Sequence, residues 1–98
     1  MKITQKKAKE IIDNEEVIIL DVRTKDEYAQ GHIKNAVLIP DFEIKDKAEK
    51  IIKDKSKKIL VYCQSGIRSS AAEKLLIYMG YDNVYDFGGI NTWPYGTV

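Results

Sequence analysis

Four short runs rich in branched apolar residues are the feature that most constrains the fold of this 98-residue chain. The runs are VIILDV at 17–22, AVLI at 36–39, ILVY at 59–62 and VYDF at 84–87. Their apolarity is nearly continuous, which is typical of strands covered on both faces of a parallel sheet. Apolar residues at steps of three or four precede or separate these runs, at 8–12, 44–52 and 72–79. Strands that alternate with helices predict an α/β layered domain.

Polar residues and a glycine that are typical of helix ends agree with this alternation of strands and helices. Thr24 with Glu27, and Ser70 with Glu73, have the spacing of helix capping boxes, and Gly80 stands where a left-handed helix stop would lie. The chain has no internal repeat and no low-complexity linker, and its length suits a single core. We therefore expect one domain over residues 1–98.

Composition excludes several classes of function. The 16 basic residues nearly balance the 15 acidic ones, so the chain lacks the basic surface that nucleic-acid binding requires. No apolar run approaches the ~20 residues of a membrane helix, and no apolar leader follows the first residues, so we expect a cytoplasmic monomer. A single cysteine, Cys63, and a single histidine, His32, exclude an internal disulfide framework and a Cys/His zinc cluster.

The only cysteine follows the third apolar run directly and precedes the third helical pattern. This order places Cys63 at the carboxyl end of a parallel strand, the edge where open α/β sheets bind ligands. Gly66 permits the backbone angles of a loop whose N–H groups turn inward. A helix beginning near Ser69 adds its positive dipole end, and Arg68 adds a permanent charge. Together these residues predict an anion pocket with sulfur at its floor.

Rough energies favour an ionised thiol in such a pocket. The helix end stabilises a thiolate by about 1 kcal/mol. A guanidinium ~8 Å away adds about 2 kcal/mol at an effective dielectric of ~20. Most lone cysteines are small, inert core residues, but an inert Cys63 would need neither Gly66 nor Arg68 beside it. We therefore interpret Cys63 as a nucleophile.

Three blocks of sequence, in this order, resemble the single-domain sulfurtransferases of the rhodanese family. The blocks are LDVRTKDEYAQGHIKNAVLIP at 20–40, ILVYCQSGIRSSAAEKLLIYMGY at 59–81 and NVYDFGGINTW at 83–93. The resemblance implies the rhodanese-like α/β fold, with a largely parallel five-stranded sheet and helices on both faces. It implies that Cys63 carries sulfur, without metal or organic cofactor. It also implies a substrate-binding cradle made by Gln64, Ser65, Gly66, Ile67, Arg68 and Ser69.

The resemblance further implies a two-step reaction. The Cys63 thiolate takes a sulfur atom from a small anionic donor such as thiosulfate, and the Cys63 persulfide then passes it to a thiol, cyanide-like or protein acceptor. Gln64 and Ser65 are neutral, so a dianionic donor meets one full charge in the loop. A persulfide therefore remains an alternative sulfur donor to thiosulfate.

Loop length separates this chain from related dual-specificity phosphatases. Their loops place five residues between cysteine and arginine, after a histidine, whereas here four residues separate Cys63 from Arg68 and Tyr62 stands before the cysteine. The tighter ring suits a sulfur atom better than a tetrahedral phosphate.

Residues at the end of the first strand have expected structural roles. Asp21 and Arg23 emerge at the edge that holds Cys63, and we expect them to brace the loop. Glu27 has two alternatives, pairing with Arg23 or closing its capping box. His32 is interpreted as a hydrogen-bonded turn residue.

Two other functions stay open at this point. The lysine-rich segment 43–58 would suit a non-catalytic interaction module that keeps the fold. A reactive, exposed thiol would suit a redox or persulfide sensor.

Overall fold

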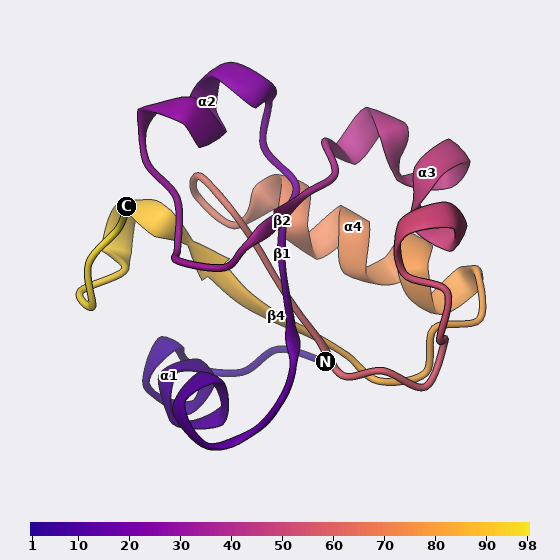
Figure 1. Ribbon diagram of the computed structural model, residues 1–98, viewed down its shortest axis with the longest axis horizontal. Coiled ribbons are helices and arrows are strands. Elements are labelled where there is room, and N and C mark those ends of the chain that lie inside the picture. The colour runs from indigo at the N-terminus through magenta and orange to yellow at the C-terminus, as the bar shows by residue number, and fades with distance from the viewer.

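A parallel four-stranded sheet runs through the computed structural model, which describes residues 1–98 (Figure 1). The strands are β1 (Ile18–Asp21), β2 (Val37–Leu38), β3 (Ile59–Cys63) and β4 (Val84–Gly89), in the order β2-β1-β3-β4. In the register, Asp21 pairs with Tyr62, and Cys63 pairs with Gly89. The carboxyl ends of the three longer strands therefore meet at one edge of the sheet.

The expected fifth strand is reduced to a single bridge. Lys2 pairs with Asp86 in parallel orientation, and the N–H of Ile3 donates to the Asp86 carbonyl oxygen at 3.0 Å. A helix begins at Gln5, so too few residues lie beside β4 to extend the pairing. The prediction of five strands is therefore wrong, while the parallel α/β layering is confirmed.

Helices cover both faces of the sheet, as expected (Figure 1). On one face α1 buries Ala8 and Ile11 against β1, β3 and β4; on the other, α3 and α4 bury Ala48 and Leu76. None of these helices has the length and apolarity needed to cross a membrane. The helical elements are α1 (Gln5–Asn14), α2 (Lys25–Gln30), α3 (Ile44–Ile51) and α4 (Ile67–Tyr78), with two short 3₁₀ turns, η1 (Asp41–Glu43) and η2 (Ile90–Thr92).

Alternation along the central strands divides the core into two clusters. Leu20 and Val61 belong to the cluster under α3 and α4, whereas Leu60 and Tyr62 belong to the cluster under α1. Cys63 lies in the cluster under α3 and α4. Because the central strands β1 and β3 are covered on both faces, their residues are apolar on both sides, which explains their continuous runs in the sequence.

Two of the predicted helix signals are confirmed. The Thr24 hydroxyl accepts the Glu27 N–H at 3.2 Å, and a Glu27 carboxylate oxygen accepts the Thr24 N–H at 3.0 Å, which completes the capping box of α2. Gly80 has φ +102° directly after α4, and the following N–H of Tyr81 donates back to the Leu76 carbonyl oxygen at 3.0 Å.

The third signal is wrong. α4 begins at Ile67, two residues before the expected start, with Gly66 as its N-cap. Ser70 therefore lies inside the helix, and its N–H donates to the Gly66 carbonyl oxygen. Glu73 is buried in the middle of the helix, where its carboxylate pairs with the amino group of Met1.

Gly80→Ala should destabilise the protein by about 1 kcal/mol, because an alanine resists the left-handed conformation. The added Cβ would have room, since its nearest neighbours are side-chain atoms of Lys55 at 3.5 Å. Gly80→Asn should lose less stability than Gly80→Ala, because asparagine tolerates positive φ better than alanine does. Urea unfolding of the three proteins measures the difference. Equal stability for all three would contradict the assigned helix stop.

Candidate active site

The thiol of Cys63 lies at the carboxyl end of β3 and is enclosed by the loop that follows. The residue is 1% exposed. Its Sγ accepts a hydrogen bond from the Gly66 N–H at 3.0 Å and lies 3.5 Å from the Ser69 hydroxyl oxygen. Ser69 is itself held by the Gly66 and Gly88 carbonyl oxygens, at 3.2 and 3.4 Å. The sulfur atom is thus fixed at the floor of a short loop by two polar partners.

The helix that starts at this loop has an uncapped N-terminus. The side chains of Thr4 and Thr24 cap α1 and α2, but Gly66 has no side chain to cap α4. The N–H groups of a first helical turn have no partner within the helix. Gly66 adopts φ +102°, a conformation that glycine reaches without strain. The positive end of α4 is therefore available to an anion beside the sulfur.

The wall opposite the loop is formed by the two glycines at the end of β4. A Cβ on Gly66 would lie 3.6 Å from the Gly88 Cα, and a Cβ on Gly89 would lie only 2.4 Å from the Gln64 carbonyl oxygen. That oxygen also accepts the Asn91 N–H at 3.2 Å. These two glycines flank the loop that encloses Cys63, and the close backbone approach explains why Gly89 has no side chain.

Arg68 is paired with an acidic residue of α2. Its two terminal nitrogens donate to the two carboxylate oxygens of Glu27 at 2.7 and 2.8 Å. These hydrogen bonds lower the pKa of Glu27 to about 2 and raise the pKa of Arg68 above its ordinary value. Of the two alternatives for Glu27, closing its capping box is confirmed and pairing with Arg23 is wrong. Arg68, expected as an unpaired cation, is neutralised by Glu27.

Asp21 and Arg23 form a buried ion pair directly below the loop. Both carboxylate oxygens of Asp21 accept hydrogen bonds from Arg23, at 2.8 to 3.1 Å. The remaining donors of Arg23 reach the Gln64 side chain at 3.2 Å and the Gly31 carbonyl oxygen at 2.7 Å. Although burial acts to lower the pKa of Arg23, the hydrogen bonds to Asp21 raise it above its ordinary value. The pair therefore contacts the loop through Gln64.

Tyr62 completes this buried network and was missed by sequence reasoning. Its hydroxyl donates to Asp21 at 2.6 Å and accepts the Ile33 N–H at 3.1 Å. Burial, together with the hydrogen bond to Asp21, raises the pKa of the Tyr62 hydroxyl. The residue before the cysteine thus faces away from the pocket, where a neighbouring strand can hold it. Its place in a continuous apolar run gave no sign of a polar role.

The other predicted residues lie around the loop or away from it. Gln64, Ser65 and Ile67 are exposed and form its rim. His32 stacks on Tyr28 and lies with Nδ1 3.0 Å from the Tyr28 carbonyl oxygen, which confirms its role as a hydrogen-bonded turn residue.

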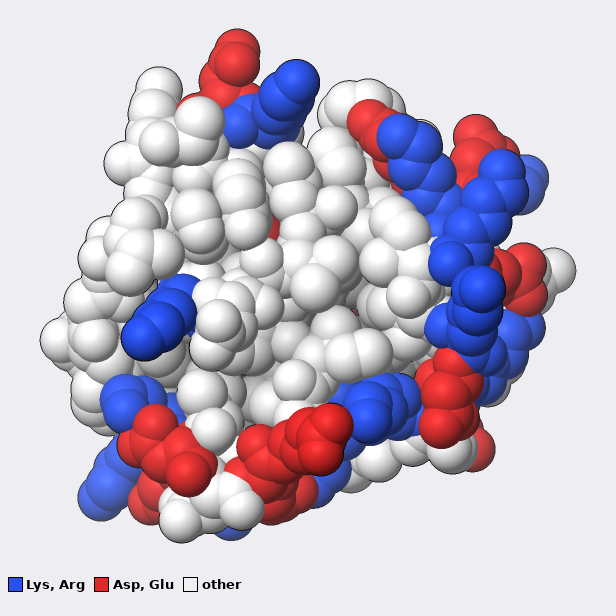
Figure 2. Space-filling model, viewed as in Figure 1, with Lys and Arg blue, Asp and Glu red and all other residues white.

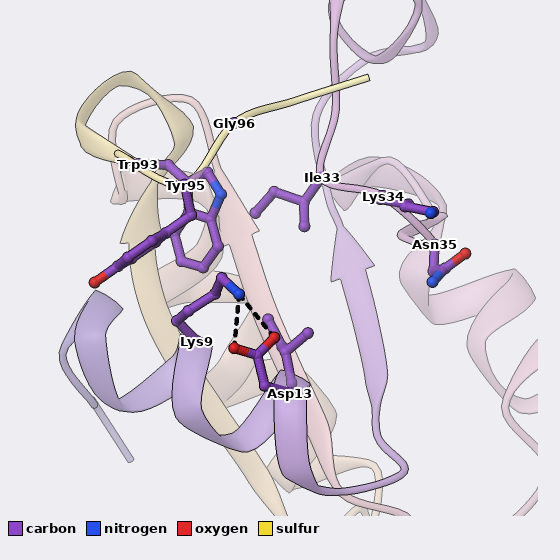
Figure 3. A pocket seen from close by; sticks show the side chains of 9 residues that line it. Lys9, Asp13, Ile33, Lys34, Asn35, Trp93, Tyr95 and Gly96 are labelled. Atoms are coloured by element: carbon purple, nitrogen blue, oxygen red, sulfur yellow. Dashed lines mark hydrogen bonds and ion pairs between the residues drawn. The ribbon is translucent and has the colours of Figure 1, made fainter.

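Cavity size does not mark the candidate site. The largest hollow, about 420 Å³, lies between α1 and the C-terminal segment and is lined by residues such as Lys9, Ile33 and Trp93 (Figure 3). No residue of the Cys63 loop lines it. A polar hollow of about 290 Å³ adjoins the loop instead, with Arg23 and Gln64 in its lining. The Cys63 thiol and its hydrogen-bond partners, and not the largest hollow, therefore mark the candidate site.

Comparison with known protein families agrees with this geometry. The family model described as rhodanese-like domain matches residues 4–94. The chain belongs to the rhodanese-like domain family. The match spans the Asp21–Arg23 pair, the Cys63 loop and the glycines of β4, so the whole candidate site lies within it.

Relatives with named activities are similar over most of the chain. A protein named thiosulfate sulfurtransferase GlpE from Coxiella burnetii is 36% identical over 93 residues, covering 94% of this chain and 85% of its own. Thiosulfate sulfurtransferase PspE from Escherichia coli is 37% identical over 71 residues, covering 72% of this chain and 68% of its own. The crystal structure of a rhodanese-related protein from Thermoplasma volcanium superposes with a TM-score of 0.86 at 35% identity, over 99% and 96% of the two chains.

Glu27→Gln should flatten the acid limb of the stability profile. The folded pKa of Glu27, about 2, lies below its ordinary value of 4.5, so its pairing contributes stability that is complete above about pH 5 and is lost as the pH falls toward 2. The variant lacks this carboxylate and should lose less stability over that range. Urea unfolding at pH 7, 5, 4 and 3 measures both slopes. Parallel profiles would contradict the ion pair with Arg68.

Proposed function

We propose that this protein is a sulfurtransferase that carries a sulfane sulfur atom on Cys63. The observation that carries the proposal is a lone thiol held by the Gly66 N–H at 3.0 Å, beside the uncapped N-terminus of α4. The amide donor and the positive end of the helix are placed to stabilise negative charge on the groups that react at this sulfur. Relatives named thiosulfate sulfurtransferase support the same activity for this chain.

The reaction proceeds in two displacements. The Cys63 thiolate attacks the outer sulfur of the donor; with thiosulfate, the S–S bond of the donor breaks and sulfite leaves with its electron pair. The new persulfide reaches ~2 Å beyond Sγ, toward the rim of the loop. A nucleophilic acceptor, such as a thiol, cyanide or a protein thiolate, then attacks the outer sulfur, and Cys63 leaves as the thiolate.

The cradle of residues Gln64 to Ser69 acts through its backbone. Because Glu27 neutralises Arg68, the charge that develops on the departing group is stabilised by the first-turn N–H groups of α4 and by the helix dipole. Arg68 holds the loop against α2. With no uncompensated cation in the ring, a persulfide donor is accommodated as well as thiosulfate.

Asp21 and Arg23 act as positioning residues in this proposal. Arg23 connects the Asp21 carboxylate at the end of β1 to the side chain of Gln64, the residue after the nucleophile. Their contacts lie below the loop and involve no thiol atom. They therefore fix the loop without taking part in sulfur transfer.

Transfer and sensing both begin at the Cys63 thiol, and the named relatives favour transfer. Two relatives similar over most of the chain are named thiosulfate sulfurtransferase. The proposal places the enzyme in the cytoplasm as a monomer, without a metal or organic cofactor.

Incubation with thiosulfate should add one sulfur atom to Cys63, detected as the mass of one sulfur by intact-protein mass spectrometry and removed by cyanide. Cys63→Ser should gain no sulfur and should produce no thiocyanate, because serine cannot form a persulfide. A low-molecular-weight persulfide serves as a second donor. Absence of the adduct with both donors in the folded wild type would rule out the proposed activity.

Gly89→Ala should lower kcat/KM for sulfur transfer by roughly 10- to 100-fold, because its Cβ would displace the loop carbonyl of Gln64. The φ of Gly89 is −116°, so the backbone itself tolerates alanine. Gly96→Ala is the control for a general loss of stability, since its φ of +92° strains an alanine while a Cβ there meets no atom within 4 Å. Circular dichroism checks the fold of both variants. Equal transfer rates in the two would contradict the proposed role of the β4 wall.

A further inference from the structure

The solvent face of α4 is apolar apart from one lysine. Ile67, Ala71, Lys74 and Tyr78 are spaced four, three and four residues apart, so they share one face of the helix, and all are exposed. Ile67 is 79% exposed and Tyr78 is 89% exposed. Lys74 is the only charged residue of the four. A surface helix ordinarily turns charged residues to water, so α4 has the composition of a helix covered on both sides.

This apolar face begins at the mouth of the sulfur site. Ile67 is the first residue of α4 and follows Gly66, whose N–H holds Sγ. Phe42, on η1, is 71% exposed, and η1 packs against α4. Large apolar side chains of this kind form the centres of protein interfaces, where they are desolvated by the partner. We define the docking face as Ile67, Ala71, Lys74, Tyr78 and Phe42.

Unpaired lysines lie on α3 and in the segment after it, next to the docking face. Residues 43–58 contain seven lysines against four acidic residues, and Lys57 and Lys58 pair with Glu16 and Glu15 outside the segment. Lys45, Lys50 and Lys53 are exposed and form no ion pair. Figure 2 shows basic side chains, with acidic ones among them, along the right edge of this view, where α3 and the segment after it lie. Lys74 adds a further positive charge within the docking face.

We propose that the docking face binds a thiol-bearing protein whose contact surface is apolar at its centre and acidic at its rim, and that this protein exchanges sulfur with Cys63. The inference rests on the proposed sulfurtransferase function. The apolar residues of the docking face match the apolar centre of such a partner, and the neighbouring lysines attract its acidic rim. A second copy of this chain would set lysines against lysines. A lipid surface offers no nucleophile to a face that opens on the sulfur site.

Transfer to this partner balances without an added oxidant or reductant. The partner thiolate attacks the outer sulfur of the Cys63 persulfide, forming a new S–S bond. The S–S bond at Cys63 breaks, and its electron pair stays on Cys63 as the thiolate. The partner leaves as a persulfide. The small acceptor cyanide uses the same displacement but needs no docking face, which makes the two acceptors a direct comparison.

Two synthetic cysteine peptides with the same apolar residues, one flanked by glutamates and one by lysines, serve as probes of the docking face. We expect the Cys63 persulfide to transfer sulfur to the acidic peptide with a kcat/KM about tenfold above that for the basic peptide. The preference should shrink at high salt, because exposed charges are screened. Persulfide on each peptide is measured by mass spectrometry.

Ala71→Glu combined with Tyr78→Glu should remove most of this preference, about a tenfold loss for the acidic peptide, and leave the rate with cyanide unchanged. Both positions are exposed, so the fold should persist. The control replaces Lys6 and Lys34, exposed lysines without ion pairs outside the docking face, by glutamine. It changes the net charge by the same amount and should keep the preference.

The remaining outcomes distinguish failure of the proposed function from failure of the docking face. No transfer to cyanide or to either peptide overturns the proposed function itself. Normal transfer to cyanide with equal rates for both peptides, or an unchanged preference in the double variant, overturns the docking face alone. A concentration-dependent dimer in sedimentation that the double variant abolishes would assign this face to a second copy. Binding to phosphatidylserine vesicles, without peptide preference, would assign it to a membrane surface.

Discussion

The buried ion pair between Asp21 and Arg23 is the interaction on which the rest of the site depends. Both side chains are buried, and charges removed from water are costly unless every donor and acceptor is satisfied. Here each carboxylate oxygen of Asp21 has at least two donors, including the Tyr62 hydroxyl. The other donors of Arg23 form hydrogen bonds to the Gln64 side chain and the Gly31 carbonyl oxygen. One network thus joins β1, β3, the α2–β2 connection and the Cys63 loop at the carboxyl edge of the sheet.

With both arginines near the loop paired, the pocket must hold an anion mainly by geometry. Backbone N–H groups are partial charges whose effect falls off within a turn of helix, so they work only at hydrogen-bond distance. This requirement explains the close approach of β4 to the loop, where Gly89 leaves no room for a Cβ. It also explains why the cradle has four residues between Cys63 and Arg68, since a longer ring would move the amides away from a single sulfur atom.

Local patterns in the sequence predicted most of the fold and the place of Cys63 at the carboxyl end of a strand. The continuous apolar runs predicted the parallel strands, and Thr24 with Glu27 predicted a capping box, because these signals depend on neighbours in the chain. The partner of Arg68 was missed because Glu27 lies 41 residues away, and only the fold brings the two side chains together. The helix start was misplaced because Gly66 caps α4 without a side-chain signal. The fifth strand was expected from resemblance, and the early start of α1 leaves only a bridge.

α4 connects the chemistry of the site to the surface of the molecule. Its N-cap, Gly66, provides the amide that holds Sγ, its inner face packs against β3 and β4, and its outer face presents Ile67 and Tyr78 to solvent. A helix that only held the sulfur and packed against the sheet could carry charged residues on its outer face at little cost, as α1 and α3 do. The retention of apolar side chains on the outer face therefore requires a separate reason. Because this face starts at the loop that holds the sulfur, a partner seated on it would bring its own thiol to the mouth of the pocket, and the same helix would then serve both the reaction and the choice of acceptor.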